Sequence, residues 1–312
     1  LISFVSQDFV GYDEDNEVYM IAADYQISLA PVYLFQQVVP CGSSLSANLG
    51  KTIRVENFPL IWLLGGSGGY YDTYTGDTLL IPGTGCIWGG GASDYAAVTS
   101  INLNSQSLTT DFNFLDNFNN LNFIELGNNS IGNITLTNNI ALTTLRIGGN
   151  LISSLNLLNN ILLEDLRTNS CSNLTTLNIS NNTLLRIAIL SACNYTSLDF
   201  SNNLLLTEIQ ANGNLSLLNV DIAGLTVLNK LYVGGTLIQD IDISTNVNVI
   251  DFRASSARFT NLTNSQLLVD LDAHGLSNGY FQSSIFGGGT LTTAGLAAKA
   301  ALLLKGWTIV GL

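Results

Sequence analysis

Residues 142–162 read LTTLRIGGNLISSLNLLNNIL, and the fold of the chain follows from this stretch. The residues before it, 121–141, read LNFIELGNNSIGNITLTNNIA, with Leu, Ile and Asn at the same positions. The pattern recurs about every 21–22 residues; further units begin at Leu163, Leu185, Leu206, Leu228 and Val249, with degenerate units near Val98 and at Leu268. A fixed period of this length is typical of a solenoid.

Each unit contains the element L-x-L-x-x-N twice. Alternation of apolar and other residues predicts a short, half-buried strand, and the Asn after it predicts a turn. Equivalent strands of successive coils stack about 4.8 Å apart, so each strand position builds its own parallel sheet. One coil cannot bury its own leucines, and stacking provides the burial. The sequence therefore predicts a mainly β solenoid of about eight or nine coils with two short strands per coil.

Three parts of the chain differ in pattern. Residues 1–95 do not repeat, and we predict a β-rich domain there that serves anchoring or assembly. Residues 96–274 form the repeat, and residues 275–312 a cap that closes its apolar end. Within the cap, Ala and Leu at helical spacing predict a helix over 292–305, with Gly306 as its stop and a strand over 307–310.

The repeat resembles the leucine-rich repeats of the IRREKO type, whose unit nests two related halves. The resemblance covers about residues 98–274, and it departs at Cys171 and Cys193, which replace the first Asn, and at Thr236 and Leu225. The region from residue 271 to Gly279, with KGWT at 305–308, resembles the C-terminal closure of repeat proteins of Bacteroidetes and phages. These likenesses imply a leucine-rich-repeat fold, with Cys171 and Cys193 as buried thiols.

Composition and charge exclude some classes of partner and of location. Hydrophobic residues make up 46% of the chain and charged residues 11%, and the net charge is −13. Nucleic acid is a poor partner for such a chain, because phosphate binding needs clustered Lys and Arg. No apolar run is long enough to span a bilayer.

The sequence contains few of the residues and motifs that enzymes use for catalysis. The chain has one His, His274, and lacks the motifs of zinc proteases, serine hydrolases and P-loop enzymes. We expect a protein that is not an enzyme and needs no cofactor. A carbohydrate-active enzyme is a weaker hypothesis that would need a paired-carboxylate cleft.

Two columns of residues point away from the core in the predicted strands. On the first strand the column includes Glu125, Arg146, Arg167, Gln210, Tyr232 and Arg253, with Asp272 in the last unit. It is either a recognition surface or an ordinary solvated face. On the second strand Asp199, Asp221 and Asp242 follow one another. Their repulsion would be relieved by a cation such as calcium, or the column is repeat structure alone.

Cysteine use adds one open question. Cys41 and Cys86 lie together in the N-terminal part, where they form either a disulfide or two thiols. Cys171 and Cys193 lie one coil apart, near disulfide range, so a ladder disulfide is the alternative to buried thiols. We predict no protein metal site.

Two functions fit these features. The first is a secreted or surface-exposed protein that acts in binding or adhesion through the solenoid face, with a protein or glycan surface as partner. The second is a self-assembling structural component of a phage virion or an extracellular filament, with copies of itself as partner. Both place the protein outside the cell, on a cell surface or on a virion surface.

Overall fold

A computed structural model describes residues 9–13, 18–21, 34–36, 52–56, 78–81, 86–89, 99–105, 108 and 112–312. The chain divides into two compact units, 1–142 and 143–312, which are described separately.

The first unit contains mostly short antiparallel pairs. Strands β1 (Phe9–Asp13) and β2 (Val18–Ile21) pair antiparallel, and so do β5 (Thr78–Ile81) and β6 (Cys86–Gly89). Strand β4 (Thr52–Glu56) lies antiparallel between β3 (Leu34–Gln36) and β7 (Ser100–Asn102). Strand β7 pairs parallel with β8 (Phe123–Glu125), and the 3-10 helix η2 spans Asn113–Asn117. Parallel stacking therefore begins where the sequence repeat begins.

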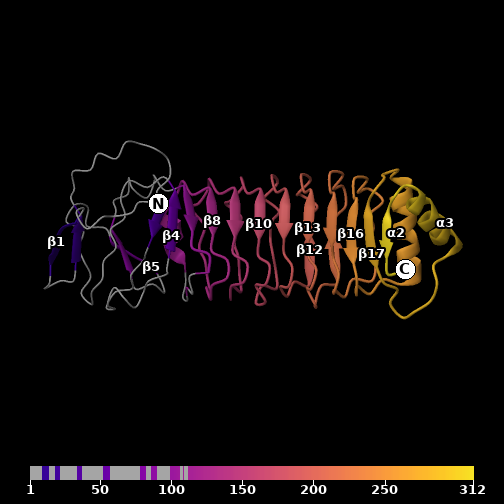
Figure 1. The fold of residues 1–312 in the computed structure, drawn as a ribbon, viewed down its shortest axis with the longest axis horizontal. Coiled ribbons are helices and arrows are strands. Elements are labelled where there is room, and N and C mark those ends of the chain that lie inside the picture. Colours follow the sequence, from indigo (N-terminus) through magenta and orange to yellow (C-terminus); the bar gives the residue numbers. More distant parts are fainter. Residues whose placement is uncertain are drawn as a thin grey trace. The chain divides into compact units, whose positions relative to one another are not determined.

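The second unit is built on one parallel sheet of equivalent strands (Figure 1). In order, these are β9 (Thr144–Arg146), β10 (Asp165–Arg167), β11 (Ile187–Ile189), β13 (Glu208–Gln210), β15 (Lys230–Tyr232), β16 (Asp251–Ala254), β17 (Tyr280–Ser283) and β18 (Thr308–Val310). Each strand pairs in register with the equivalent strand of the next coil, as Leu166 does with Leu145 and with Ala188. This is the solenoid that the period predicts, with the leucine-rich-repeat fold that the resemblance implies.

Burial follows the alternation within each short strand. The middle residue points inward, and Leu145, Leu166 and Leu231 are all 0% exposed. Of the other residues in the quoted stretch, Leu142, Ile147 and Leu157 are also fully buried, whereas Leu155 is only half-buried. The core is therefore a stack of aliphatic side chains, each shielded by the coils on both sides.

The second half of the coil forms less sheet than predicted. Only β12 (Ser197–Asp199) and β14 (Asn219–Asp221) pair there as strands, in parallel, and Asn156 forms an isolated bridge with Asn178. Most second-half segments end in an Asn or Asp that accepts a hydrogen bond from the backbone N–H two residues later, as Asn156 does from Leu158 at 3.1 Å. This turn limits each second-half strand to a few residues, whether or not it pairs with its neighbour.

Two columns of buried Asn hold successive coils together. In the first column, Asn214 donates to the carbonyl oxygens of Leu190 and Ala211 at 2.9 and 2.8 Å. In the second, Asn182, Asn203 and Asn246 donate in the same way to carbonyl oxygens of the coil before. These amides satisfy carbonyls that the turns leave inside the core.

The C-terminal end corrects one prediction. The degenerate unit predicted at Leu268 is instead helix α2 (Asn261–Ala273), so Asp272 does not belong to the first-strand column. Thr260 caps this helix by accepting from the Thr263 N–H. The residues Leu267, Leu268 and Leu271 are buried, at a spacing that suits one face of a helix.

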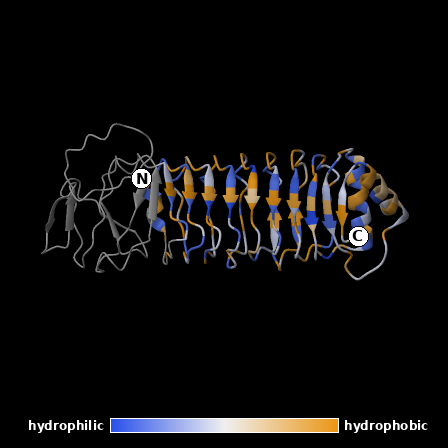
Figure 2. Ribbon diagram, in the orientation of Figure 1, coloured by the Kyte–Doolittle hydropathy of each residue, from blue (hydrophilic) through white to orange (hydrophobic). Residues whose placement is uncertain are grey.

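The predicted cap helix and strand are both present. Helix α3 (Thr293–Leu304) is capped by Thr292, and Gly306 ends it with a φ of 82°, followed by β18. Lys305 reaches the carboxylate of Asp272 at 2.7 Å, which ties the end of α3 to the end of α2. Hydrophobic residues colour both helices in Figure 2, as expected of elements that cover an apolar end. No helix in the described parts of the chain combines the length and hydropathy needed to cross a membrane.

Candidate binding face

The outer surface of the parallel sheet carries the first and third residues of each strand, on either side of the buried middle residue. We call the residues at these positions in β9 to β17 the sheet face. In order, they are Thr144, Arg146, Asp165, Arg167, Ile187, Ile189, Glu208, Gln210, Lys230, Tyr232, Asp251, Arg253, Tyr280 and Gln282. Because each strand is held in register by both neighbours, these side chains stand in fixed rows.

An ionic cluster forms the start of the sheet face. The guanidinium of Arg146 contacts the Asp165 carboxylate at 2.7 Å, and Arg167 contacts the same carboxylate at 2.9 Å. The Asp165 side chain is only 12% exposed, while the two arginine side chains are 34% and 37% exposed. One buried carboxylate thus orients two arginines and leaves part of each guanidinium accessible, with a net positive charge on the cluster.

The middle of the sheet face is apolar on β11 and polar on the next two strands, β13 and β15. Ile187 and Ile189 are half-buried on β11. On the next two strands, Glu208 accepts a hydrogen bond from the Gln210 amide at 2.6 Å and pairs with Lys230 at 3.2 Å. The two isoleucines therefore separate one charged cluster from the next.

Two tyrosines and an arginine form a stacked cluster at the far end of the sheet face. The Arg253 guanidinium lies 4.7 Å from the ring centre of Tyr232 and 4.8 Å from that of Tyr280. Asp251 fixes this arginine by accepting from its Nε at 2.8 Å and its Nη2 at 2.9 Å. The Tyr232 hydroxyl donates to the same carboxylate at 2.6 Å. An arginine stacked between two rings and still 45% exposed is pre-organised for contact with a partner.

The phenol of Tyr232 is not suited to proton transfer. Burial, together with its hydrogen bond to Asp251, raises the pKa of Tyr232 to about 12. The hydroxyl therefore stays protonated near neutral pH, where it holds Asp251 in place.

The structure groups the predicted column and extends it. Arg146, Arg167, Gln210, Tyr232 and Arg253 stand on the sheet face, and Glu125 occupies the equivalent place on β8 of the first unit. The column predicted from the sequence leaves out the first-position partners, chiefly Asp165, Glu208 and Asp251. The signal was present, because the residue two before an outward-facing residue in a strand also faces outward.

The acidic column on the second half of the coil is part of the turns. Asp199, Asp221 and Asp242 each accept from the backbone N–H two residues later, at 2.9, 3.0 and 2.8 Å. Hydrogen bonds from Ser201 lower the pKa of Asp199, and those from Ser244 lower the pKa of Asp242. Within the described residues, no three acidic, Cys or His side chains converge in a way that would hold a metal ion.

The cysteines of the repeat are buried free thiols. Cys171 and Cys193 form no disulfide, and their sulfurs donate to the carbonyl oxygens of Ile147 and Thr168. Burial raises the pKa of Cys171 to about 11. Whether Cys41 and Cys86 form a disulfide or two thiols falls outside the described residues, since Cys41 is not described and only the backbone of Cys86 is.

His274, the one histidine, ends helix α2. Both of its ring nitrogens are buried without a hydrogen-bond partner in the described parts of the chain. No nucleophile is paired with this ring there, and the sheet-face carboxylates are taken up by ion pairs.

Comparison with known proteins agrees on the fold. No model of a protein family matches the sequence, and no curated protein matches it. Among solved structures, the functional domain of InlJ from Listeria monocytogenes, described as including a cysteine ladder, is similar with a TM-score of 0.57 and 23% identity. TLR13 in complex with the single-stranded RNA ssRNA13 is similar with a TM-score of 0.51 and 17% identity.

The match to InlJ covers 69% of this chain and 50% of that one, and the match to TLR13 covers 70% and 33%. The chain thus spans half or less of these proteins. The likeness identifies a leucine-rich-repeat solenoid. The IRREKO type and the likeness of the C-terminal closure stay predictions.

Proposed function

We propose that this chain is a non-enzymatic binding protein whose sheet face recognises a macromolecular partner, with a protein surface as the first candidate and a glycan as the second. The observation that carries the proposal is the arrangement of Tyr232, Arg253 and Tyr280. A stacked arginine held by Asp251 exposes a planar donor without the entropy loss of ordering it on binding. Tyr and Arg are also the residues enriched where binding energy concentrates.

The rest of the sheet face supports the same proposal. The Arg146 and Arg167 cluster supplies a second set of oriented donors, and Ile187 and Ile189 lie on the strand between the two sets. A rigid row with charged ends and an apolar middle suits a large, flat partner. Such a row does not supply the poised general base or activated nucleophile that catalysis requires.

The location and partner class extend this proposal. We propose an extracellular, cell-surface or virion-surface protein that acts in adhesion, supported by the low content of charged residues and the abundance of Asn, Ser and Thr. A negative net charge of −13 argues against nucleic acid as the partner.

Arrays of purified extracellular proteins and of glycans, probed with the whole chain, test the function. For each hit, Arg253→Glu and Arg146→Glu are expected to weaken binding about tenfold or more. Because each change places a carboxylate beside Asp251 or Asp165, a thermal melt is run on every variant to show that it is still folded at the assay temperature. Arg186→Glu is the matched control, because Arg186 precedes β11 and forms only a loose pair with Glu164 at 3.5 Å. The proposal would be refuted if every hit bound both sheet-face variants as tightly as the unmodified chain, or if the chain turned over a glycan or a peptide.

Self-assembly is the second candidate function, and helix α3 favours it. The outward residues Leu296, Leu303 and Leu304 are 54%, 50% and 91% exposed. An apolar helix surface at the end of a solenoid suits packing against another copy. Sedimentation velocity decides between the two functions. Self-assembly is supported if the unmodified chain forms a polymer and the double variant Leu303→Glu, Leu304→Glu is a monomer. A chain that stays monomeric at high concentration rules self-assembly out.

A further inference from the structure

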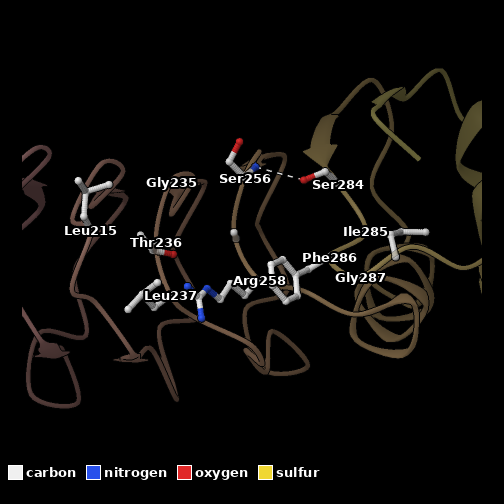
Figure 3. Close-up of a pocket in the computed structure, with 11 residues that line it drawn as sticks. Leu215, Gly235, Thr236, Leu237, Ser256, Arg258, Ser284, Ile285, Phe286 and Gly287 are labelled. Carbon is white, nitrogen blue, oxygen red and sulfur yellow. Dashed lines mark hydrogen bonds between the residues drawn. The ribbon is translucent and has the colours of Figure 1, made fainter.

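A groove separate from the sheet face lies at the turns that follow the last first-half strands. It has a volume of about 500 Å³ and shares no residue with the sheet face. Leu215, Leu237 and Phe286 supply apolar walls, and Ser256 and Ser284 lie at its rim (Figure 3). Leu215 is 73% exposed and Phe286 is 55% exposed, so two large apolar side chains line an open surface.

Arg258 in this groove differs from every other basic side chain that the structure describes. Arg146, Arg167, Arg186, Lys230, Arg253 and Lys305 each lie within 4.0 Å of a carboxylate, and Lys299 donates to the carbonyl oxygen of Leu312. Arg258 alone in this set has no carboxylate or carbonyl partner for its guanidinium. The lining of the groove also contains no acidic residue. A chain with a net charge of −13 thus leaves a cation unneutralised here.

The guanidinium has one aromatic neighbour, and the backbone around it is fixed. Arg258 lies over the ring of Phe286, 5.5 Å from its centre. The backbone at both residues is anchored: the Arg258 N–H donates to the carbonyl oxygen of Ile238 at 2.9 Å, and the Phe286 N–H donates to that of Phe259 at 2.7 Å. The Ser256 N–H donates to the Ser284 hydroxyl at 3.2 Å across the rim (Figure 3). The backbone that lines the groove is therefore fixed before a partner binds, which lowers the entropy cost of filling the groove.

We propose that this groove binds a partner protein segment in which an acidic side chain is flanked by aliphatic ones. The carboxylate would accept paired hydrogen bonds from the Arg258 guanidinium, a geometry that arginine favours. The aliphatic neighbours would cover Leu215, Leu237 and Phe286. This site goes beyond the proposed sheet-face function and does not depend on it.

The polar groups of the groove favour this segment over an acidic sugar. A sugar ring presents several hydroxyls that need partners when they are desolvated. The Thr236 hydroxyl has already given its one proton to the carbonyl oxygen of Val233 at 2.8 Å. Besides Arg258, only the Ser256 and Ser284 hydroxyls of the lining are left as side-chain donors, which is few for a sugar. One carboxylate and apolar side chains match what the lining offers.

Amide NMR titration of the whole chain with two capped peptides tests the site. The probes are acetyl-Leu-Glu-Leu-amide and acetyl-Leu-Gln-Leu-amide, which differ only in charge. The signals of Ser256, Arg258 and Phe286 are expected to shift saturably. The Glu peptide is expected to bind about fivefold tighter, at the upper end of what an exposed ion pair contributes. Arg258→Gln is expected to abolish that preference, while Phe286→Ala weakens both peptides alike.

The matched control is Arg186→Gln, which removes an exposed arginine outside the groove and is expected to retain the fivefold preference. Because Arg258 and Arg186 are both exposed, neither change removes a buried group. The proposal is overturned if neither peptide shifts these signals, or if the preference survives in Arg258→Gln. It is also overturned if digalacturonate binds the groove more tightly than the Glu peptide, because the site would then take an acidic glycan.

Discussion

Substitutions of Asn203 separate the two roles that a buried amide can play in this solenoid. Asn203 is 0% exposed, and its Nδ2 donates to the carbonyl oxygens of Ile179 at 3.1 Å and Asn182 at 2.8 Å. Its Oδ1 is buried with no hydrogen-bond partner in the described parts of the chain. Leu225 occupies the same place in the next coil and is also 0% exposed. The column thus already tolerates an aliphatic side chain.

We expect Asn203→Leu to cost about 1 kcal/mol of unfolding free energy. Two hydrogen bonds are lost, worth about 1 kcal/mol each, and burial of an aliphatic side chain offsets part of the loss. Neither carbonyl oxygen is left without a hydrogen bond. That of Ile179 still accepts from the Asn182 N–H at 3.0 Å, and that of Asn182 still accepts from the Leu185 N–H at 3.1 Å.

Asn203→Asp has nearly the same shape and a larger expected cost. An ionised oxygen in the place of Nδ2 would face two carbonyl oxygens inside the core. Burial and this repulsion would raise the folded-state pKa above the unfolded value, so the penalty is smallest below the unfolded pKa of about 3.9. It grows as the pH rises toward the folded-state pKa. A rise of about 3 units corresponds to about 4 kcal/mol at neutral pH.

Urea melts followed by circular dichroism at pH 4 and pH 7 measure both effects. Asn203→Leu is expected to show the same small loss at both pH values, measured against the unmodified chain at each pH. Asn203→Asp is expected to lose several kcal/mol more at pH 7 than at pH 4. Equal, pH-independent losses for the two variants would refute the reasoning, since the amide would then matter only by its shape.

Two further predictions concern the core. Leu166→Ala is expected to lower the unfolding free energy by about 2–5 kcal/mol, because Leu166 is 0% exposed between two coils. A loss under about 0.5 kcal/mol in a denaturant melt would contradict the place of Leu166 in the core. Native Cys171 is expected to react with iodoacetamide at pH 8 about a hundredfold more slowly than in the urea-unfolded chain, because its pKa of about 11 leaves little thiolate. Peptide mapping by mass spectrometry reads this site separately, and equal rates in the two states would show that the thiol is not buried.

The outcome at residues 261–273 shows how far a pattern can mislead. The leucines here continue the spacing of the repeat, so the sequence reasoning placed a coil at Leu268. The segment is helix α2, because Thr260 supplies a cap and Leu267, Leu268 and Leu271 bury one helical face. Leucines three apart suit a coil and a helix alike, and the cap and the packing decide between them.

The sequence by itself determined the solenoid, its coil boundaries as far as the unit that begins at Val249, and the helix and strand of the cap. The cause is that stacked coils must bury apolar residues at a fixed period, which is visible in one dimension. The tertiary structure alone decided which polar groups meet. Tyr280 reaches Arg253 only because β17 follows helix α2 and still pairs in register with β16. Arg258 meets Phe286 across the C-terminal turns in the same way, and such distant contacts leave no period in the chain.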